Sequence, residues 1–305
     1  MTNPRIAAPV ETRTADATLI GHTAPVNAIA FHPAGRILAS GGDVTARLWH
    51  DGEPGLVFTA DAYVLSVAFS PDGAVLAIGD LSGGIALWTL GTDEVTPLTG
   101  PGGPVENLAF SPDGRALAAS YAERVSRDGP PGMRPTVRVW DLTTRTPRVL
   151  SVRPGGYGHA LAFSPDGRVL ATSGGLDGSG QLLDPVTGDA TAFTGHAGGI
   201  HTLAYSPDGI LASGSVDSTI RLWRDPVLTL EPDAGYVTAL AFSPDGRTLA
   251  GACAPAVRLW DSETGRHRAT LFGPAEHVTG LAFAPDGSAL AGAGHDRAIW
   301  LWNSR

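Results

Sequence analysis

The sequence predicts an all-β fold built from similar units, because one turn motif recurs along the chain at nearly constant spacing. The motif Phe-Ser-Pro-Asp-Gly, or a close variant, begins at Phe31, Phe69, Phe110, Phe163, Tyr205, Phe242 and Phe283. Successive copies start 38, 41, 53, 42, 37 and 41 residues apart, and a period near 40 is typical of repeat architectures. In each copy an aromatic residue ends a predicted strand, proline sets φ for the turn, and Asp-Gly tolerates the positive φ of a tight hairpin.

The composition supports a turn-rich β protein with a large core. The chain has 305 residues, with 40 glycines and 24 prolines that fall mainly at the periodic turns. Hydrophobic residues make up 43% of the sequence, which separates it from low-complexity chains with the same glycine and proline content. Because the repeat array is so regular, one domain over residues 14–305 is expected rather than two.

Charge and cysteine content restrict the expected partners and compartment. The net charge of -9 and pI of about 5.4 argue against a broad basic face, so no nucleic-acid partner is expected. Cys253 is the single cysteine, which rules out an intramolecular disulfide and suits a reducing compartment. No apolar run approaches the roughly 18 residues of a membrane span, so no membrane partner is expected. The predicted localisation is cytoplasmic.

Taken in order, the chain begins with an expected flexible tail over residues 1–13, followed by an isolated strand over 15–20. Each later unit predicts four strands. In the first unit these are residues 26–31, which end at the aromatic residue, 37–40, 46–49 and 56–59. The third strands of the seven units end at Trp49, Trp88, Trp140, Leu183, Trp223, Trp260 and Trp302.

Four short antiparallel strands per period, with the third ending in Trp or Trp-Asp, resemble the tryptophan–aspartate (WD) repeat family of β-propellers. The Ser-Pro-Asp-Gly turns look like those of bacterial members. The resemblance extends over about 290 residues and implies a seven-bladed propeller with four antiparallel strands per blade. It also implies a buried hydrogen-bond network in two of the blades, made by His22, Ser40, Asp43 and Trp49 in the first copy and by His196, Ser213, Asp217 and Trp223 in the fifth. The other copies lack the histidine and are expected to depend more on packing.

The two ends of the chain are expected to close the ring. The last copy stops at its third strand, residues 298–302, and lacks a fourth. The isolated strand at 15–20 can supply it, which would leave no open sheet edge at the seam.

The third copy carries an insertion. From the motif aromatic to the end of the third strand takes 30 residues there, against 18 to 20 in the other copies. The excess, residues 121–135, includes Arg124 and Arg127 and is predicted to be a surface loop. Insertions in repeat arrays often lie on a binding face, and a tolerated mobile loop is the equally weighted alternative.

No specific enzyme signature is present. The sequence has no P-loop, no GxGxxG after a strand, no GxSxG elbow and no HExxH. Asp72 and its repeats are interpreted as turn residues. No cofactor or metal is expected, and catalysis stays open as the less favoured alternative.

The resemblance implies that the start of each first strand opens onto the mouth of a central channel. One set of mouth positions comprises Asn27, Leu65, Glu106, His159, His201, Thr238 and Thr279. A second comprises Pro25, Tyr63, Pro104, Tyr157, Gly199, Tyr236 and His277. A third, before the turn aspartate, includes Leu81, Leu176 and His295.

Two subsets of these positions could bind. Glu106, His159 and His201 come from consecutive blades and should share one sector of the mouth. They could form a metal-ligand set, an acid/base pair or a solvated polar rim. Tyr63, Tyr157 and Tyr236 offer rigid contact area with a polar tip, which suits protein interfaces; covering the ends of the first strands is the alternative.

The sequence therefore leaves three hypotheses for function. The favoured one is a non-catalytic scaffold that binds a protein or peptide at the channel mouth, weakly preferring a basic partner. The second is a small-molecule or catalytic site at Glu106, His159 and His201, with residues 121–135 as a lid. The third is assembly with itself, or with a co-expressed enzyme, through the blade edges.

Overall fold

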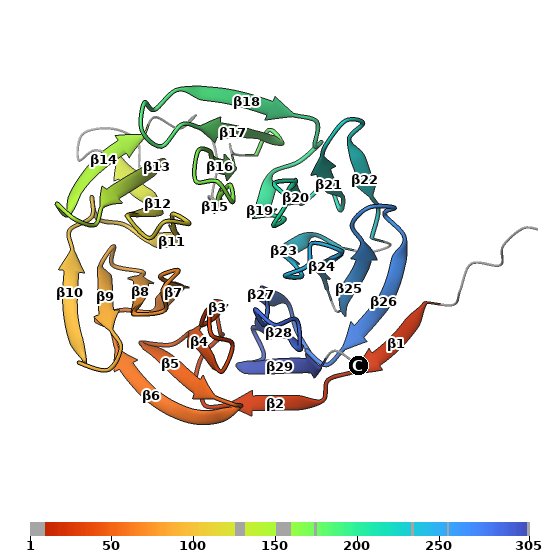
Figure 1. Ribbon diagram of the computed structural model, residues 1–305, viewed down its shortest axis with the longest axis horizontal. Coiled ribbons are helices and arrows are strands. Elements are labelled where there is room, and N and C mark those ends of the chain that lie inside the picture. The colour runs from red at the N-terminus through yellow and green to blue at the C-terminus, as the bar shows by residue number, and fades with distance from the viewer. Residues whose placement is uncertain are drawn as a thin grey trace, which may run out of the picture.

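The computed structural model describes residues 10–125, 132–150, 160–173, 176–232, 235–254 and 256–303. These residues form seven sheets arranged as a ring around a central axis (Figure 1). None of them lies in a helix, so the described chain contains no helix that could cross a membrane. The predicted all-β, seven-bladed propeller is thereby confirmed.

Within each blade, consecutive strands pair antiparallel and are placed outward from the axis in chain order; the two strands at the start of the chain, described below, are added at the outside of blades 6 and 7. Blade 1 contains β3 (Ala28–Phe31), β4 (Ile37–Gly41), β5 (Thr45–His50) and β6 (Glu53–Thr59). Blade 2 contains β7 (Val64–Phe69), β8 (Val75–Asp80), β9 (Ile85–Thr89) and β10 (Glu94–Leu98). Blade 3 contains β11 (Val105–Phe110), β12 (Ala116–Val125), β13 (Gly132–Asp141) and β14 (Thr146–Leu150). Blade 4 contains β15 (Leu161–Phe163), β16 (Leu170–Ser173), β17 (Ser179–Leu183) and β18 (Ala190–Thr194).

The remaining blades follow the same order. Blade 5 contains β19 (Ile200–Tyr205), β20 (Leu211–Ser215), β21 (Ile220–Trp223) and β22 (Leu228–Leu230). Blade 6 contains β23 (Val237–Phe242), β24 (Thr248–Cys253), β25 (Ala256–Asp261) and β26 (His267–Phe272). Blade 7 contains β27 (Val278–Phe283), β28 (Ala289–Gly294) and β29 (Ala298–Asn303).

The fourth strand of blade 7 comes from the start of the chain, as predicted. Strand β2 (Ala17–Ile20) pairs antiparallel with β29, from Ala17 opposite Leu301 to Ile20 opposite Ala298. Figure 1 shows the red β2 beside the blue β29. Leu19 points from β2 into a core cluster that includes Trp49 and Ile299. The first and last segments therefore share one sheet.

A further strand lies where the tail was expected. Strand β1 (Glu11–Thr14) pairs in parallel with β26, so blade 6 has five strands. Arg13 donates to the Asn303 carbonyl and lies 3.7 Å from the Asp16 carboxylate. The expected tail boundary at residue 13 is therefore wrong for residues 11–13, because the outer edge of β26 offers backbone groups to which an added strand can pair.

The insertion in blade 3 is an extended hairpin, not the predicted loop, over its described residues. Strands β12 and β13 continue pairing from Tyr121 opposite Thr136 to Val125 opposite Gly132. Arg124 lies in β12, while Arg127 falls outside the described residues. A loop was predicted because insertions in repeat arrays usually lie in loops.

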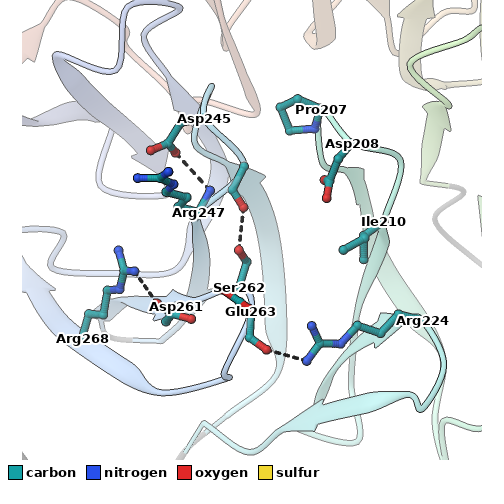
Figure 2. A pocket seen from close by; sticks show the side chains of 11 residues that line it. Pro207, Asp208, Ile210, Arg224, Asp245, Arg247, Asp261, Ser262, Glu263 and Arg268 are labelled. Atoms are coloured by element: carbon teal, nitrogen blue, oxygen red, sulfur yellow. Dashed lines mark hydrogen bonds and ion pairs between the residues drawn. The ribbon is translucent and has the colours of Figure 1, made fainter.

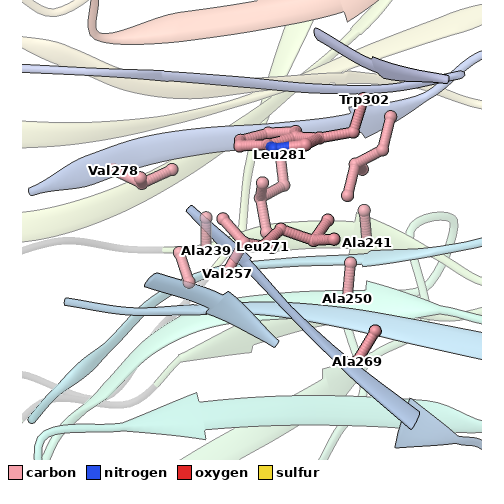
Figure 3. Packing of buried hydrophobic residues seen from close by; sticks show 11 residues of the cluster. Ala239, Ala241, Ala250, Val257, Ala269, Leu271, Val278, Leu281 and Trp302 are labelled. Atoms are coloured by element: carbon pink, nitrogen blue, oxygen red, sulfur yellow. The ribbon is translucent and has the colours of Figure 1, made fainter. Parts of the chain in front are cut away.

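The core lies between neighbouring sheets. Figure 3 shows the cluster between blades 6 and 7, where the Trp302 ring covers small and aliphatic side chains that include Leu281, Leu271 and Ala250. Small residues let the sheets approach each other: at Gly251 of blade 6, a Cβ atom would lie 3.0 Å from Cδ1 of Ile220 in blade 5 and 2.9 Å from the Trp260 ring of its own blade. Alanine and glycine on the second strands therefore suit the space beneath the tryptophans.

The recurring motif makes the same turn in several blades. Asp72 accepts hydrogen bonds from Ser70 Oγ at 2.6 Å and from the Ala74 amide at 3.0 Å, and Gly73 has φ of 74°. Equivalent serine–aspartate pairs occur at Ser111, Ser164, Ser206 and Ser243. The hydrogen bond from Ser70 is the main reason that the pKa of Asp72 is lowered. These carboxylates stabilise hairpins.

Candidate functional site

The propeller has two faces, which carry different sets of turns. The motif turns lie at the end of each first strand, so the loops that enter the first strands lie at the opposite end, which is the channel mouth. There they meet the turns between second and third strands: the Leu81 amide donates to the Tyr63 carbonyl at 2.9 Å, and the His295 amide donates to the His277 carbonyl at 3.0 Å. The second and third sets of predicted mouth positions are therefore neighbours.

The first set of positions lines one cavity on the axis. Its volume is about 290 Å³, and first-strand residues from all seven blades surround it. Six of the seven predicted residues contribute to the wall: Asn27, Leu65, Glu106, His201, Thr238 and Thr279. The seventh, His159, lies outside the described residues.

Several polar residues in this wall fasten one blade to the next. The Asn27 side-chain amide donates to the Val64 carbonyl at 2.8 Å. Thr238 Oγ1 donates to the Val278 carbonyl at 2.6 Å, and Thr279 Oγ1 to the Val26 carbonyl at 2.5 Å. Ser66 makes a similar bond, to the Val105 carbonyl at 3.1 Å. These positions contribute to ring closure, a role that the sequence did not suggest because it depends on the register of the neighbouring blade.

Glu106 and His201 supply the ionisable groups in the described wall. Glu106 is half-buried, and the protein around the His201 ring lowers its pKa through desolvation. His201 is therefore expected to be neutral at pH 7 and able both to donate and to accept a hydrogen bond. The described residues contain no group of three or more side chains suited to hold a metal.

The network residues of blade 5 form a continuous hydrogen-bonded chain. Trp223 Nε1 donates to Ser213 Oγ at 2.9 Å, Ser213 Oγ lies 2.7 Å from His196 Nε2, and His196 Nδ1 lies 2.9 Å from Asp217. Since the Asp217 carboxylate can only accept, the neutral ring carries its proton on Nδ1, and the unprotonated Nε2 accepts from the Ser213 hydroxyl. This histidine is a structural element rather than a ligand.

Blade 1 repeats the network with a looser histidine contact. Trp49 Nε1 donates to Ser40 Oγ at 2.8 Å, and Ser40 lies 2.8 Å from His22 Nε2. His22 Nδ1 is 3.3 Å from Asp43, whose carboxylate also accepts from Thr23 and Thr45. Asp43 thereby joins the loop before the first strand to the turn after the second.

Blade 3 replaces the histidine with Tyr121. The strand register gives Tyr121 the position of Gly42 in blade 1, and a Cβ at Gly42 would point at the His22 ring. The Tyr121 ring lies 6.1 Å from the Trp140 ring, close to the 6.2 Å between the His196 and Trp223 rings. It is fully buried, and its hydroxyl has no hydrogen-bond partner among the described residues. Packing of this ring therefore takes the place of the network.

The histidine networks predict acid sensitivity in two steps. Burial lowers the pKa of His22 and of His196 despite the raising effect of the nearby aspartates. For Asp217 burial opposes ionisation, but hydrogen bonds from Thr219, Ala197 and His196 outweigh it and lower its pKa to about 2. The unfolded chain binds more protons than the folded chain at acid pH. The contribution of the two histidines to the free energy of unfolding is therefore complete above about pH 6.5 and is lost as the pH falls below that value. The aspartate contribution is complete above about pH 4 and is lost toward pH 2.

Denaturant unfolding measured from pH 8 to pH 3 tests this expectation. A His22→Gln/His196→Gln variant should lose most of the first step and keep the second. A wild-type stability that is flat between pH 7 and pH 5 would contradict the assignment of buried neutral histidines.

The described tyrosines of the mouth are exposed. Tyr63 is 50% exposed and Tyr236 is 59% exposed, while Tyr157 lies outside the described residues. Leu81 and Leu176 are also exposed on the turns between second and third strands. His277 is exposed, and its ring lies 6.1 Å from that of His295. The mouth thus presents bulky side chains to solvent.

The opposite face carries a groove of about 650 Å³ between blades 5 and 6 (Figure 2). One ion pair and several side-chain-to-backbone hydrogen bonds join parts of its lining. Arg268 pairs with Asp261 within blade 6, and Arg224 of blade 5 donates to the Glu263 carbonyl of blade 6 at 2.6 Å. Ser262 Oγ donates to the Gly246 carbonyl at 2.5 Å. These bonds hold neighbouring turns together. A variant in the groove can therefore serve as a control for variants at the mouth.

Comparison with known protein families gives matches over most of the chain. The family model described as "WD domain, G-beta repeat" matches residues 14–50, 52–89, 157–182, 189–224, 224–261 and 265–303. These segments omit the copy that forms blade 3, in which Tyr121 and the extended hairpin depart from the pattern.

Individual relatives are similar over parts of the chain. It is 32% identical over 163 residues to the WD repeat-containing protein SL1-17 of Schistosoma mansoni, which covers 52% of this chain and 50% of that protein. It is 30% identical over 161 residues to the target of rapamycin complex subunit LST8 of Mus musculus, covering 48% and 46% of the two chains. It is 27% identical over 256 residues to the serine-threonine kinase receptor-associated protein of Gallus gallus, covering 69% of each. The chain thus spans about half the length of the first two of these curated relatives.

Proposed function

The chain belongs to the WD-repeat family of β-propellers, and on that premise we propose that it is a non-catalytic scaffold that binds a protein or peptide partner at the channel mouth. The observation that carries this proposal is the exposure of Tyr63 and Tyr236 on loops that enter first strands. Aromatic side chains on rigid loops provide contact area at low entropic cost and are enriched among interface hot spots.

The relatives support a role in protein assemblies. The name of the mouse relative describes a subunit of a complex, and that of the chicken relative describes a protein associated with a receptor. The net charge of -9 favours a partner with basic groups and disfavours nucleic acid. We extend the proposal to a cytoplasmic protein of bacterial type, on the composition and the Ser-Pro-Asp-Gly turns.

Partner binding at the mouth predicts a clear difference between faces. The full chain serves as bait, captured proteins are identified by mass spectrometry, and the complex is rebuilt from purified components. The Tyr63→Ala/Tyr236→Ala variant should weaken binding at least about tenfold, because an exposed aromatic anchor contributes on the order of 1–2 kcal/mol. Arg247→Ala, in the groove of the opposite face, should leave the affinity within about twofold. Equal weakening by both variants would overturn the assignment of the mouth.

A second candidate function rests on the channel cavity, because Glu106 and His201 line the same 290 Å³ space. A small polar ligand there would use His201 as a hydrogen-bonding group and Glu106 as a charge, with the hairpin of blade 3 as a lid. His201→Ala should then abolish ligand binding while Tyr63→Ala/Tyr236→Ala retains it, which is the reverse of the pattern expected for a protein partner.

A further inference from the structure

Three exposed side chains of the mouth come from the adjoining turns and loop of blades 1 and 2. Val44, Tyr63 and Leu81 are 41%, 50% and 46% exposed, and they form what is here called the mouth patch. Backbone bonds link the segments that carry them: the Ala60 amide, at the start of the Tyr63 loop, donates to the Val44 carbonyl at 2.8 Å, and the Leu81 amide donates to the Tyr63 carbonyl at 2.9 Å. The loop that carries Tyr63 is therefore held between the turn of blade 1 and the turn of blade 2.

Both turns of the mouth patch are rigid. Asp80 accepts hydrogen bonds from the amides of Ser82, Gly83 and Gly84 at 2.8 to 3.0 Å, which fixes the turn that presents Leu81. Asp43 holds the turn that presents Val44 through the Thr45 amide at 3.0 Å. A partner that contacts these side chains would not have to order the loops first, and pre-organisation of this kind increases affinity.

The charge around the mouth patch is negative. Asp61 is exposed within the loop that carries Tyr63, and the carboxylates of Asp43 and Asp80 lie in the adjoining turns. Arg47 contacts Thr45, and Arg138 lies near Tyr121 in the next blade. Asp43 and Asp80 are buried and hydrogen-bonded within their turns, whereas Asp61 presents its carboxylate to solvent beside Tyr63. The sector therefore attracts a cationic partner.

Blade 6 provides a matched contrast. Tyr236 occupies the position of Tyr63 and is equally exposed. The turn beside it carries Cys253, which is fully buried, and Ala254. Tyr236 therefore lacks the bulky apolar neighbour that Leu81 gives to Tyr63.

We infer that the mouth patch is the anchoring subsite, and that it binds a peptide segment carrying an apolar side chain next to a lysine or arginine. The apolar side chain packs on Tyr63 and Leu81, and the basic group faces Asp61. This inference rests on the proposed scaffold function and deepens it, because it assigns binding to blades 1 and 2 rather than to the whole rim.

Selection from a phage-displayed library of random 12-residue peptides on the full-length protein tests the inference. Recovered peptides, made synthetically and measured by fluorescence anisotropy, should pair an apolar residue with a basic one. Tyr63→Ala and Leu81→Asn should each weaken binding about tenfold. Asp61→Asn should weaken it about threefold and flatten its salt dependence. Tyr236→Ala should change it less than about twofold. All four residues are exposed, so thermal melts should show intact folding.

The contrary outcomes are equally specific. Failure to recover any peptide, recovery of acidic peptides, or an effect of Tyr236→Ala as large as that of Tyr63→Ala would overturn the inference. So would a dimer in light scattering that Leu81→Asn dissociates, since a second copy would then occupy the patch. If a captured protein partner depends on Tyr236 but not on Tyr63 or Leu81, the scaffold function stands and the anchoring subsite falls. If it depends on no mouth residue, both fall.

Discussion

A chain that starts at Gly21 is expected to lose at least about 10 °C in melting temperature, or to fail to fold. The truncation removes β1 and β2 together, which leaves β29 and β26 with open outer edges. It also removes Leu19, which is 7% exposed in the core beside Trp49. Since a propeller avoids open edges by closing its ring, the loss should affect cooperative unfolding of the whole molecule. Differential scanning calorimetry measures the effect.

Two adjacent residues separate closure from a general effect of truncation. Leu19→Ala should cost about 2–4 kcal/mol by denaturant unfolding, because it opens a cavity in the core. Ile20→Ala, at a side chain that is 77% exposed, should cost less than about 0.5 kcal/mol. A chain that starts at Val10 keeps both strands and should melt close to wild type. Equal costs for the two point variants would show that β2 is not packed as a blade strand.

After the truncation, the largest expected effect is that of Asp217→Ala, which should lower the free energy of unfolding by about 3 kcal/mol. The carboxylate accepts from His196 at 2.9 Å, from the Ala197 amide at 2.8 Å and from Thr219 Oγ1 at 2.7 Å. Removing it leaves a buried imidazole N–H and a backbone amide without an acceptor, and such losses are among the costliest single changes. Chemical denaturation at pH 7.5 gives the value.

The control is Asp72→Ala, which removes an exposed turn aspartate with two local hydrogen bonds. It should cost about 1 kcal/mol or less. A double-mutant cycle between Asp217→Ala and His196→Ala should give a coupling energy above about 1 kcal/mol. Independent, additive costs would mean that the two side chains do not act as one network.

The ring could be predicted from the sequence because the residues that specify each blade lie close together in the chain and recur in every copy. Each Ser-Pro-Asp-Gly turn specifies a hairpin by itself, and seven copies fix the number of blades. Closure followed from the missing fourth strand of the last copy and the isolated strand near the start of the chain. The parallel pairing of β1 with β26 could not be predicted in this way, because it joins segments more than 250 residues apart and no turn specifies its register.

The site was predictable in position but not in role. Sequence comparison placed Asn27, Thr238 and Thr279 at the channel, where they do lie, but their bonds to the next blade depend on packing between sheets. Tyr121 looked like the first residue of a loop and is instead a buried substitute for a histidine. The signal that could have revealed it is the high strand propensity of tyrosine, since Tyr121 directly follows the second strand of its copy.

Hydrogen exchange of the protein, measured with and without a bound partner or selected peptide, tests most directly whether the mouth is the binding face. Exchange should slow at residues 60–64 and 80–84, whose backbones carry Tyr63 and Leu81, and stay unchanged at the turns of the opposite face. Slowing confined to residues 206–210 and 245–247, on the groove between blades 5 and 6, would contradict it.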